Sequence, residues 1–334
     1  MIRITDRTLS CIDERYCDKS ALSDFLNFLI ETDPGAIELS EKMYNLLSPL
    51  PEYSYALRVE NAADAEKYPH VKEFVCRGVQ ADDGKVRAEI PLGNTFKAPD
   101  ETIARYGSYA KVRVQGLDNI MCDDYMRVFQ YLKESFNGDI EFCPQNRFHC
   151  ATALAAEWIT SGAGNGSKSR VVTSFGGIGG FAPTEELVMI LRENRIRNEN
   201  KTYEFFPEMT RLFRGITKKY VRPNKPVIGG RIFHVESGVH VDGILKQPKC
   251  YEPFAPEIAG QKRKIVLGKH SGTASIMAKL SEFDIEYPQE RVPFVLEQIK
   301  KRAAERNGKV SDREFVKLIN EQLLKEQIAR ERES

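Results

Sequence analysis

Two side chains in the last third of the chain could move protons: those of His240 and Tyr251, eleven residues apart. Small residues flank His240, so its ring could stand clear of the backbone, and Tyr251 precedes a proline-rich turn. A histidine beside a phenol is a reasonable acid–base pair for proton transfer next to a carbonyl group. Glu236 and Asp242 flank His240 and could orient it, although either could equally be a solvated charge. The spacing by itself also fits two unrelated surface residues.

A second candidate is the glycine-rich segment 177–182 (GIGGFA), which fits G-x-G-x-x-A between a predicted strand and a predicted helix. It lies at the seventh repeat rather than at the start of a sheet. No acidic residue ends a strand about 20 residues later, as a dinucleotide site requires. We therefore expect a glycine-rich turn at the end of a barrel strand rather than a nucleotide site.

Metal-ligand spacing is the third possibility, and the chain offers little for it. No two histidines stand at H-x-H or H-x-x-x-H, and His70 and His149 are isolated. Cys143 and Gln145 lie two apart at the end of a predicted strand, but two such ligands make a poor site. The residues predict no catalytic metal bound by this chain.

The elements that must position these residues alternate along the first two thirds of the chain. Predicted strands cover 2–5, 36–39, 55–59, 73–76, 111–114, 140–143 and 171–175, with an eighth near 203–206. Amphipathic helices are predicted between them, including 20–31, 123–136, 151–161 and 184–194. Strands alternating with helices of this length favour a parallel sheet of βαβ units. The count matches a (β/α)₈ TIM barrel, with an open doubly wound sheet as the competing architecture.

The pattern changes after residue 220. Segment 221–232 contains two prolines and two glycines and is predicted to be a linker. We expect 1–220 to be the barrel, 233–275 a small α+β subdomain carrying His240 and Tyr251, and 276–334 closing helices. Within those helices, Pro288 can open one helix, and Ser311 with Glu314 forms a capping box ahead of another.

Composition excludes several classes of protein. Lysine and arginine number 49 against 48 acidic residues, so no charge excess points to nucleic acid. No apolar stretch approaches the roughly 18 residues that span a bilayer, and charge interrupts the first residues where a signal peptide is apolar. Seven cysteines without a C-x-x-C pair indicate reduced thiols. We expect a cytoplasmic protein with neither nucleic acid nor membrane as partner.

Residues 237–245 (SGVHVDGIL), Tyr251 and the stretch 268–272 (GKHSG) together carry a resemblance. They resemble the post-barrel subdomain of the homocitrate synthase and isopropylmalate synthase family, the DRE-TIM metallolyases. In that family a histidine in the motif G-[IV]-H-[AV]-[KD]-[AG]-I-L is followed eleven residues later by an active-site tyrosine. The resemblance implies that His240 and Tyr251 are catalytic, and the flanking Glu236 and Asp242 are the candidates to support them.

The barrel departs from the family at its first motif. The family opens with D-x-T-L-R-D-G-E-Q, in which the arginine polarises a keto acid and the next residue binds a metal. This chain has Ser10 and Cys11 at those two positions. Glu38, in the second predicted strand, matches its family position.

The later barrel motifs depart as well. The family's F-H-x-H-N strand, with two metal-binding histidines, is FCPQN here, so that Cys143 and Gln145 stand in their places. Leu117 replaces an acidic residue at a strand end, although Asp118 follows it. The family's N-G-x-G-E-R-A-G-N turn is shortened to 176–182. The resemblance thus implies a degenerate barrel without a metal beside an intact subdomain.

In this family the subdomain of one chain covers the barrel of its dimer partner. A chain with this asymmetry resembles the omega-type subunits of the two-subunit homocitrate synthases of clostridial nitrogen fixers. The resemblance implies a hetero-oligomer with a metal-binding alpha-type subunit. Acetyl-CoA and 2-oxoglutarate would bind at the shared site, and a divalent ion of the Mg, Mn or Zn class would be held by the partner. His240 and Tyr251 would act in trans, in an acyltransferase that is inactive without its partner.

Two other hypotheses remain open at this point. The chain could be a catalytically inactive regulator of an isopropylmalate, citramalate or homocitrate synthase. It could also be an enzyme with metal-free chemistry that uses Cys143 or Cys11. Only about 60 residues follow the GKHSG stretch, too few for the closing helices and a regulatory domain as well. That length modestly favours homocitrate over isopropylmalate or citramalate as the product.

Overall fold

The computed structural model describes residues 2–13, 15, 17–80, 82, 84–93, 101–122, 124–161 and 170–333. The chain divides into two compact units, Met1–Gly229 and Gly230–Ser334, so the division falls within the predicted linker. Each unit is described by itself.

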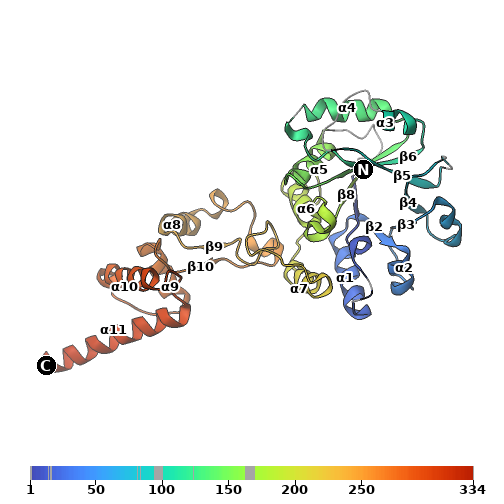
Figure 1. The fold of residues 1–334 in the computed structure, drawn as a ribbon. Coiled ribbons are helices and arrows are strands. Elements are labelled where there is room, and N and C mark those ends of the chain that lie inside the picture. The colour runs from blue at the N-terminus through green and yellow to red at the C-terminus, as the bar shows by residue number, and fades with distance from the viewer. Residues whose placement is uncertain are drawn as a thin grey trace. The chain divides into compact units, whose positions relative to one another are not determined.

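The first unit is a closed barrel of eight parallel strands with helices around it (Figure 1). Neighbours in the barrel are consecutive in the chain, and β1 closes the ring by pairing with β8, with Asp6 opposite Thr173. The predicted TIM barrel is therefore confirmed. Its strands are β1 Arg3–Asp6, β2 Gly35–Ser40, β3 Tyr55–Arg58, β4 Glu73–Arg77, β5 Val86–Pro91, β6 Lys111–Gly116, β7 Asp139–Pro144 and β8 Arg170–Thr173.

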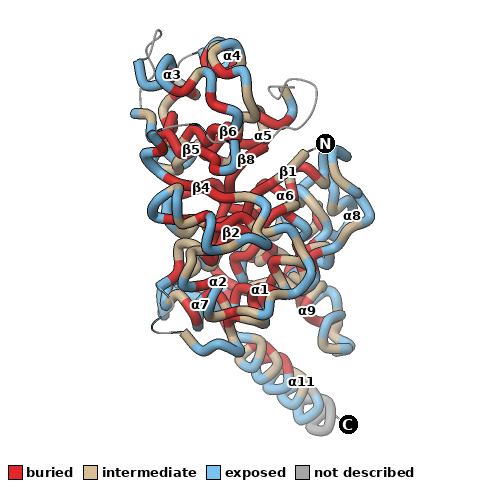
Figure 2. Tube along the Cα trace, turned by 90° about the vertical axis from the view of Figure 1, so that its right-hand side faces the viewer, coloured by how far each residue is buried: buried red, intermediate tan, exposed pale blue. Residues whose placement is uncertain are grey.

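The helices of this unit fall between the strands and after the last one. They are α1 Lys19–Thr32, α2 Glu41–Leu47, α3 Glu101–Tyr106, α4 Tyr125–Ser135, α5 Ala151–Thr160, α6 Thr184–Glu193 and α7 Phe206–Thr217. The helix predicted over 123–136 corresponds to α4, and its first predicted residue, Asp123, lies outside the described residues. Figure 2 shows that buried residues concentrate along the barrel strands. Behind β7, the rings of Phe129, Phe142 and Trp158 pack at centroid distances of 5.1 to 5.4 Å.

The strand predicted near 203–206 is wrong. Tyr203 and Phe205 precede α7 and Phe206 begins it; Tyr203 stacks on Phe206 at 4.9 Å and Phe205 stacks on Phe28 of α1 at 5.4 Å. These aromatic residues thus cover the outside of the barrel. The missing strand is β5, whose sequence VRAEIP carries a buried arginine and a buried glutamate. Because those charges interrupt the apolar pattern, hydrophobicity did not identify the strand.

The second unit contains β9 His234–Val235, α8 Gly238–Lys246, β10 Lys264–Ile265, α9 Thr273–Glu282, α10 Val292–Glu305 and α11 Asp312–Glu333. The strands β9 and β10 pair in parallel. A separate core forms between α9, α10 and the first turns of α11, including Ile276, Val295, Ile299 and Phe315. Ser311 and Glu314 form the expected capping box: the Glu314 N–H donates to Ser311 Oγ at 3.3 Å, and the Ser311 N–H to Glu314 Oε2 at 3.0 Å.

Candidate functional site

Helix α8 carries His240 on its first turn. The helix starts at Gly238, whose N–H donates to the carbonyl oxygen of His270 at 3.2 Å. A Cβ on Gly238 would lie 2.5 Å from the Cα of Gly272, so the two backbones touch here. This contact joins the start of α8 to the turn before α9, and so places the GKHSG stretch beside the helix that bears His240.

The structure brings His240 and Tyr251 together. Their ring centroids lie 5.8 Å apart, with an angle of 64° between the ring planes. Both residues are exposed, and Tyr251 retains 46% of its accessible surface. Tyr251 follows a 3₁₀ turn at Pro248–Cys250, and its N–H donates to the carbonyl oxygen of Pro248 at 2.9 Å. A phenol and an imidazole in contact at an open surface can exchange protons with a molecule that binds over them.

The two predicted supporting carboxylates contact other groups. Glu236 Oε1 accepts a hydrogen bond from the N–H of His270 at 3.1 Å, and its carboxylate occupies the space that a Cβ on Gly268 would fill. Asp242 forms an ion pair with Lys246 one turn along α8, at 2.7 Å. Glu236 therefore acts on the turn that packs against α8, while Asp242 stabilises the helix itself.

The GKHSG stretch is a compact turn that caps α9. Ser271 is buried, and its hydroxyl accepts a hydrogen bond from the N–H of Gly268 at 2.9 Å. Lys269 and His270 are exposed. Together with the carboxylate of Glu236, these bonds fix the backbone of the turn against α8.

Near the C-terminal ends of the barrel strands, Ser10, Cys11 and Cys143 stand at positions where the related family has catalytic residues. Here these side chains contact other parts of the barrel. Ser10 donates its hydroxyl to Glu38 Oε1 at 2.9 Å. Cys11 packs against the buried cluster of Cys143, Val172 and Phe181. Burial raises the pKa of the Cys143 thiol to about 12, and the nearby Arg7 opposes this only in part. A thiol in that state is a poor nucleophile and a poor metal ligand at neutral pH.

A buried network of arginines and glutamates fills the barrel interior, and the sequence analysis did not identify it. Arg113 has no exposed surface; its Nε donates to Glu141 at 2.7 Å and its Nη1 to Glu38. Arg58 donates to Glu38 at 2.8 Å and to Glu89 at 2.5 and 3.2 Å. The sequence does indicate this network, because charged residues interrupt otherwise apolar strands, as in KVRV and IEFC.

The electrostatics of this network follow from its arginines. Burial by itself would raise the pKa of Glu38, but Arg113, Arg58 and Arg7 outweigh it and hold that pKa well below its usual range. The same balance, dominated by Arg113, lowers the pKa of Glu141 to about 2. The interior carboxylates are therefore ionised and already carry their counter-charges.

These residues do not fit the divalent ion that the family implies. Both oxygens of Glu38 already accept hydrogen bonds, from Ser10, Arg58 and Arg113. A further cation lies close by, because Nε of Arg7 is 3.7 Å from Oε1 of Glu38. Within the described part of the chain, no group of three or more His, Cys, Asp or Glu residues is arranged to hold a metal ion.

The glycine-rich segment 177–182 follows β8 as a turn rather than forming a phosphate cradle. The N–H of Gly176, at the start of this turn, donates to the carboxylate of Glu185 at 2.9 Å. Glu185 and Glu186 occupy the first turn of α6, where a pyrophosphate would need positive potential. The negative charge of Glu186 at this helix start opposes the binding of a pyrophosphate.

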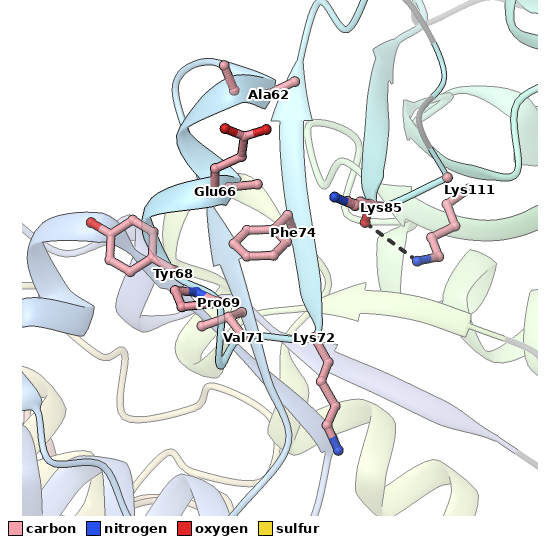
Figure 3. A pocket seen from close by; sticks show the side chains of 12 residues that line it. Ala62, Glu66, Tyr68, Pro69, Val71, Lys72, Phe74, Lys85 and Lys111 are labelled. Atoms are coloured by element: carbon pink, nitrogen blue, oxygen red, sulfur yellow. Dashed lines mark hydrogen bonds between the residues drawn. The ribbon is translucent and has the colours of Figure 1, made fainter.

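A cavity of about 580 Å³ lies on the barrel unit beside β4 and the segment that leads into β5. Figure 3 shows the side chains that line it. The ring of Phe74 faces it, and Lys111 at its edge donates to the carbonyl oxygen of Lys85 at 3.5 Å. None of the predicted site residues lines it. Across the described residues, no helix is both long and apolar enough to cross a membrane.

Comparisons with known proteins agree with this architecture. Residues 227–307 match the family model described as homocitrate synthase post-HMGL domain-like. The chain is 26% identical to the omega subunit of homocitrate synthase from Clostridium pasteurianum, over 95% of each chain. It is 32% identical to homocitrate synthase AksA of Methanothermobacter thermautotrophicus, over 63% of this chain and 56% of that one. It is 34% identical to 2-isopropylmalate synthase of Methanocaldococcus jannaschii, over 57% of this chain and 37% of that one.

Among solved structures, the HMG-CoA lyase of Bacillus subtilis matches with a TM-score of 0.50 and 14% identity, over 68% of this chain and 96% of that one. This likeness supports the barrel fold alone. The matched subdomain contains His240, Tyr251 and the GKHSG turn, and the similarity to the omega subunit runs through the barrel as well. The chain is similar to members of the homocitrate synthase and isopropylmalate synthase family, and its similarity to an omega subunit extends over nearly its whole length.

Proposed function

We propose that this chain is the accessory, omega-type subunit of a homocitrate synthase and that it donates His240 and Tyr251 to the barrel of an alpha-type partner. The observation that carries the proposal is a contrast between the two units. His240 and Tyr251 contact each other at an exposed surface of one unit. In the other unit, Ser10 donates to Glu38, which is ion-paired with Arg113, and Cys11 packs against the apolar cluster around Cys143.

The surface around His240 also suits a partner. Val239 and Leu245, on the same helix, leave 75% and 61% of their surface exposed. Apolar side chains beside exposed polar groups are typical of surfaces that another chain covers. Covering would also exclude water from His240 and Tyr251, which strengthens their interaction with a bound substrate.

In the proposed reaction, the methyl group of acetyl-CoA loses a proton, and the resulting carbanion attacks the ketone of 2-oxoglutarate. Hydrolysis of the thioester then releases CoA and homocitrate. His240 and Tyr251 would hold or transfer protons in these steps from within hydrogen-bond distance of the substrate. The partner's barrel would supply a divalent Lewis acid for the ketone. This chain would bind no metal itself, because arginines already neutralise its interior carboxylates.

The test measures release of CoA from acetyl-CoA and 2-oxoglutarate with a divalent metal present. This chain, a metal-binding alpha-type subunit and their mixture are assayed separately, and metal content is measured on each. We expect activity in the mixture only, with the metal in the partner. We expect His240→Ala and Tyr251→Phe to lower kcat by roughly 10²- to 10⁴-fold.

The matched control is His70→Ala, because His70 is an exposed histidine on the barrel unit. That variant should leave the rate of the mixture unchanged. A mixture that is indifferent to His240 would contradict donation in trans and favour a regulatory subunit without catalytic residues. Turnover by this chain alone in a chelator would favour metal-free chemistry, which the raised pKa of the Cys143 thiol already opposes. Replacing 2-oxoglutarate by other 2-oxo acids tests the substrate.

A further inference from the structure

Arg7 is a buried guanidinium that forms no hydrogen bond of ordinary length to an oxygen atom of the described residues. It follows the last residue of β1, and its backbone N–H donates to the carbonyl oxygen of Thr173 at the end of β8, so it lies at the C-terminal end of the barrel. Only 7% of its surface is exposed, and its buried Nε has no hydrogen-bond partner. Its ion pairs are long: Nε lies 3.7 Å from Glu38, and Nη1 lies 3.6 Å from Glu89. Ordinary N–H···O hydrogen bonds measure about 2.7–3.2 Å.

The side chains around Arg7 do not supply a hydrogen-bonded counter-ion. Oε1 of Glu38 already accepts a hydrogen bond from Arg58 at 2.8 Å. Nη1 of Arg7 lies 3.8 Å from Sγ of Cys143, but burial raises the pKa of that thiol to about 12, so it is neutral. The ring of Phe181 covers one face of the guanidinium, with its centroid 4.2 Å from Cζ. The Nε edge of Arg7 is therefore left to bind another group.

The ion pairs inside the barrel form one network, which contains one more cation than it contains anions. In the described part of the chain, the network joins five carboxylates to six arginines: Arg3, Arg7, Arg58, Arg87, Arg113 and Arg170. Every one of these arginines except Arg7 has a carboxylate oxygen at 2.8 Å or less. A buried charge without a paired counter-ion is costly in free energy. The excess positive charge is therefore that of Arg7, and an anion beside it would stabilise the barrel.

We propose that the C-terminal end of this barrel binds a small oxyanion, a carboxylate or phosphate group, through the Nε edge of Arg7. Arginine binds such groups with two parallel N–H donors along one edge of the guanidinium. The nearby Arg58 keeps 21% of its side chain exposed, so solvent reaches this end of the barrel. The D-x-T-L motif of the related family leaves the position of Arg7 open, so the site is a feature of this chain. It goes beyond the proposed function, because it needs neither His240 nor a partner subunit.

Isothermal titration calorimetry on the full chain tests the binding directly. Inorganic phosphate and malonate, a dicarboxylate, are titrated separately into the protein in Tris chloride buffer at constant ionic strength. We expect saturable binding of at least one of them at one site per chain, and the anion that binds identifies the ligand group. Binding of neither anion would overturn the proposal.

Two substitutions at position 7 locate the site. Arg7→Met keeps the length of the side chain and should weaken the affinity roughly ten- to a hundredfold, because a hydrogen bond to a charged group is lost. Arg7→Lys keeps the charge but offers no bidentate edge, so it should also bind more weakly than the wild type. Arg211→Met, which removes an exposed arginine, is the matched control and should leave the affinity unchanged. Full affinity in either variant of Arg7 would contradict binding through its Nε edge.

Thermal unfolding followed by the fluorescence of Trp158 measures the effect of the anion on the barrel unit. The Tm of the wild type should rise with the concentration of the anion that binds and then level off, because a ligand of the folded state stabilises it by mass action. Potassium chloride at the same ionic strength should not reproduce the rise, and Arg7→Met should not show it. An equal rise in the wild type and in Arg7→Met would place the anion elsewhere and contradict the proposal.

The Nε–H resonance of Arg7 tests the site in the wild-type protein, whatever the stability of the variants. The resonance is assigned by its absence from the spectrum of Arg7→Lys. It should shift as the anion is added and stay in place when potassium chloride is added instead. A resonance that does not move while the anion saturates the protein would overturn the proposal.

Discussion

Arg113 lies among three carboxylates inside the barrel and has no exposed surface. It donates to Glu141 and Glu38, and its Nη1 lies 3.4 Å from Glu89. Removing one member of a buried ion pair leaves an uncompensated charge, which costs more than the pair contributed. The interior of the barrel should therefore respond strongly to a change at this one residue.

We expect Arg113→Met to lower the free energy of unfolding of the barrel unit by about 3–5 kcal/mol. The measurement is urea denaturation followed by tryptophan fluorescence. Arg211→Met is the control, because Arg211 pairs with Glu208 on the surface, with 68% of its side chain exposed. Water and salt screen such a surface pair, so its loss should change the stability little. Equal effects of the two substitutions would contradict a structural role for the network.

Single residues also differ in how far the sequence could predict their place in the site. The spacing of His240 and Tyr251 was equally consistent with two unrelated surface residues. The motif around them was the stronger argument that they form one site. Their contact depends on the turn at 248–250, which no periodicity describes. The buried charges were missed because hydrophobic patterns treat Arg87 and Glu89 as surface residues.

At the scale of elements, Glu185 connects three segments. It lies on the first turn of α6, accepts from the Gly176 N–H after β8, and lies 3.3 Å from the ammonium group of Lys225 before the second unit. Burial raises the pKa of Glu185 to about 7, and the attraction of Lys225 only partly offsets this. The same residue thus ties the glycine-rich turn and the segment around Lys225 to one helix.

The raised pKa of Glu185 predicts the direction in which stability changes with pH. The folded state binds the proton of Glu185 more tightly than the unfolded state, so this contribution to stability is complete below pH 4.5 and is lost as the pH rises to about 7. Glu185→Gln keeps an acceptor for the Gly176 N–H but cannot titrate. Relative to the wild type, the variant should gain about 3 kcal/mol between pH 4.5 and 7, from roughly 1.4 kcal/mol per unit of pKa.

Urea denaturation at several pH values from 4.5 to 8 checks this difference. Glu208→Gln is the control: Glu208 is exposed, and its hydrogen bond from Arg211 lowers its pKa, so it does not titrate in this window. A pH-independent difference between Glu185→Gln and the wild type would contradict the raised pKa.

The sequence predicted the bounds of some helices well and placed one strand wrongly. Helices α1, α5 and α6 lie within two residues of their predicted bounds, because an apolar stripe with polar ends describes a surface helix. The predicted eighth strand failed for the opposite reason: a run of aromatic residues suits a strand, yet tertiary contacts with α1 and α7 decide its conformation here.

At the scale of the whole molecule, each unit has its own hydrophobic core and should unfold on its own. The single tryptophan, Trp158, lies in the barrel unit, where it is buried, so its fluorescence reports on that unit alone. Far-UV circular dichroism reports on both units. Thermal or urea unfolding should therefore show a component in circular dichroism that fluorescence does not follow.

Phe315→Ala tests this independence, because Phe315 is fully buried in the core of the second unit. We expect a loss of about 3–5 kcal/mol in the unfolding transition of that unit. The fluorescence transition of Trp158 should stay where it is. Arg113→Met should shift that fluorescence transition and leave the unfolding of the second unit unchanged. Coincident shifts in both probes would show that the two units unfold as one.

The arginines inside the barrel have a consequence for how the chain matures. A protein whose buried carboxylates are neutralised by a bound ion gains that part of its folding free energy only when the ion is supplied. Here the counter-charges of Glu38, Glu89 and Glu141 are guanidinium groups of the same chain, and they keep their protons at any pH at which a protein is folded. These interior carboxylates therefore have their counter-charges as soon as synthesis ends. We therefore expect metal starvation to leave the barrel unit folded.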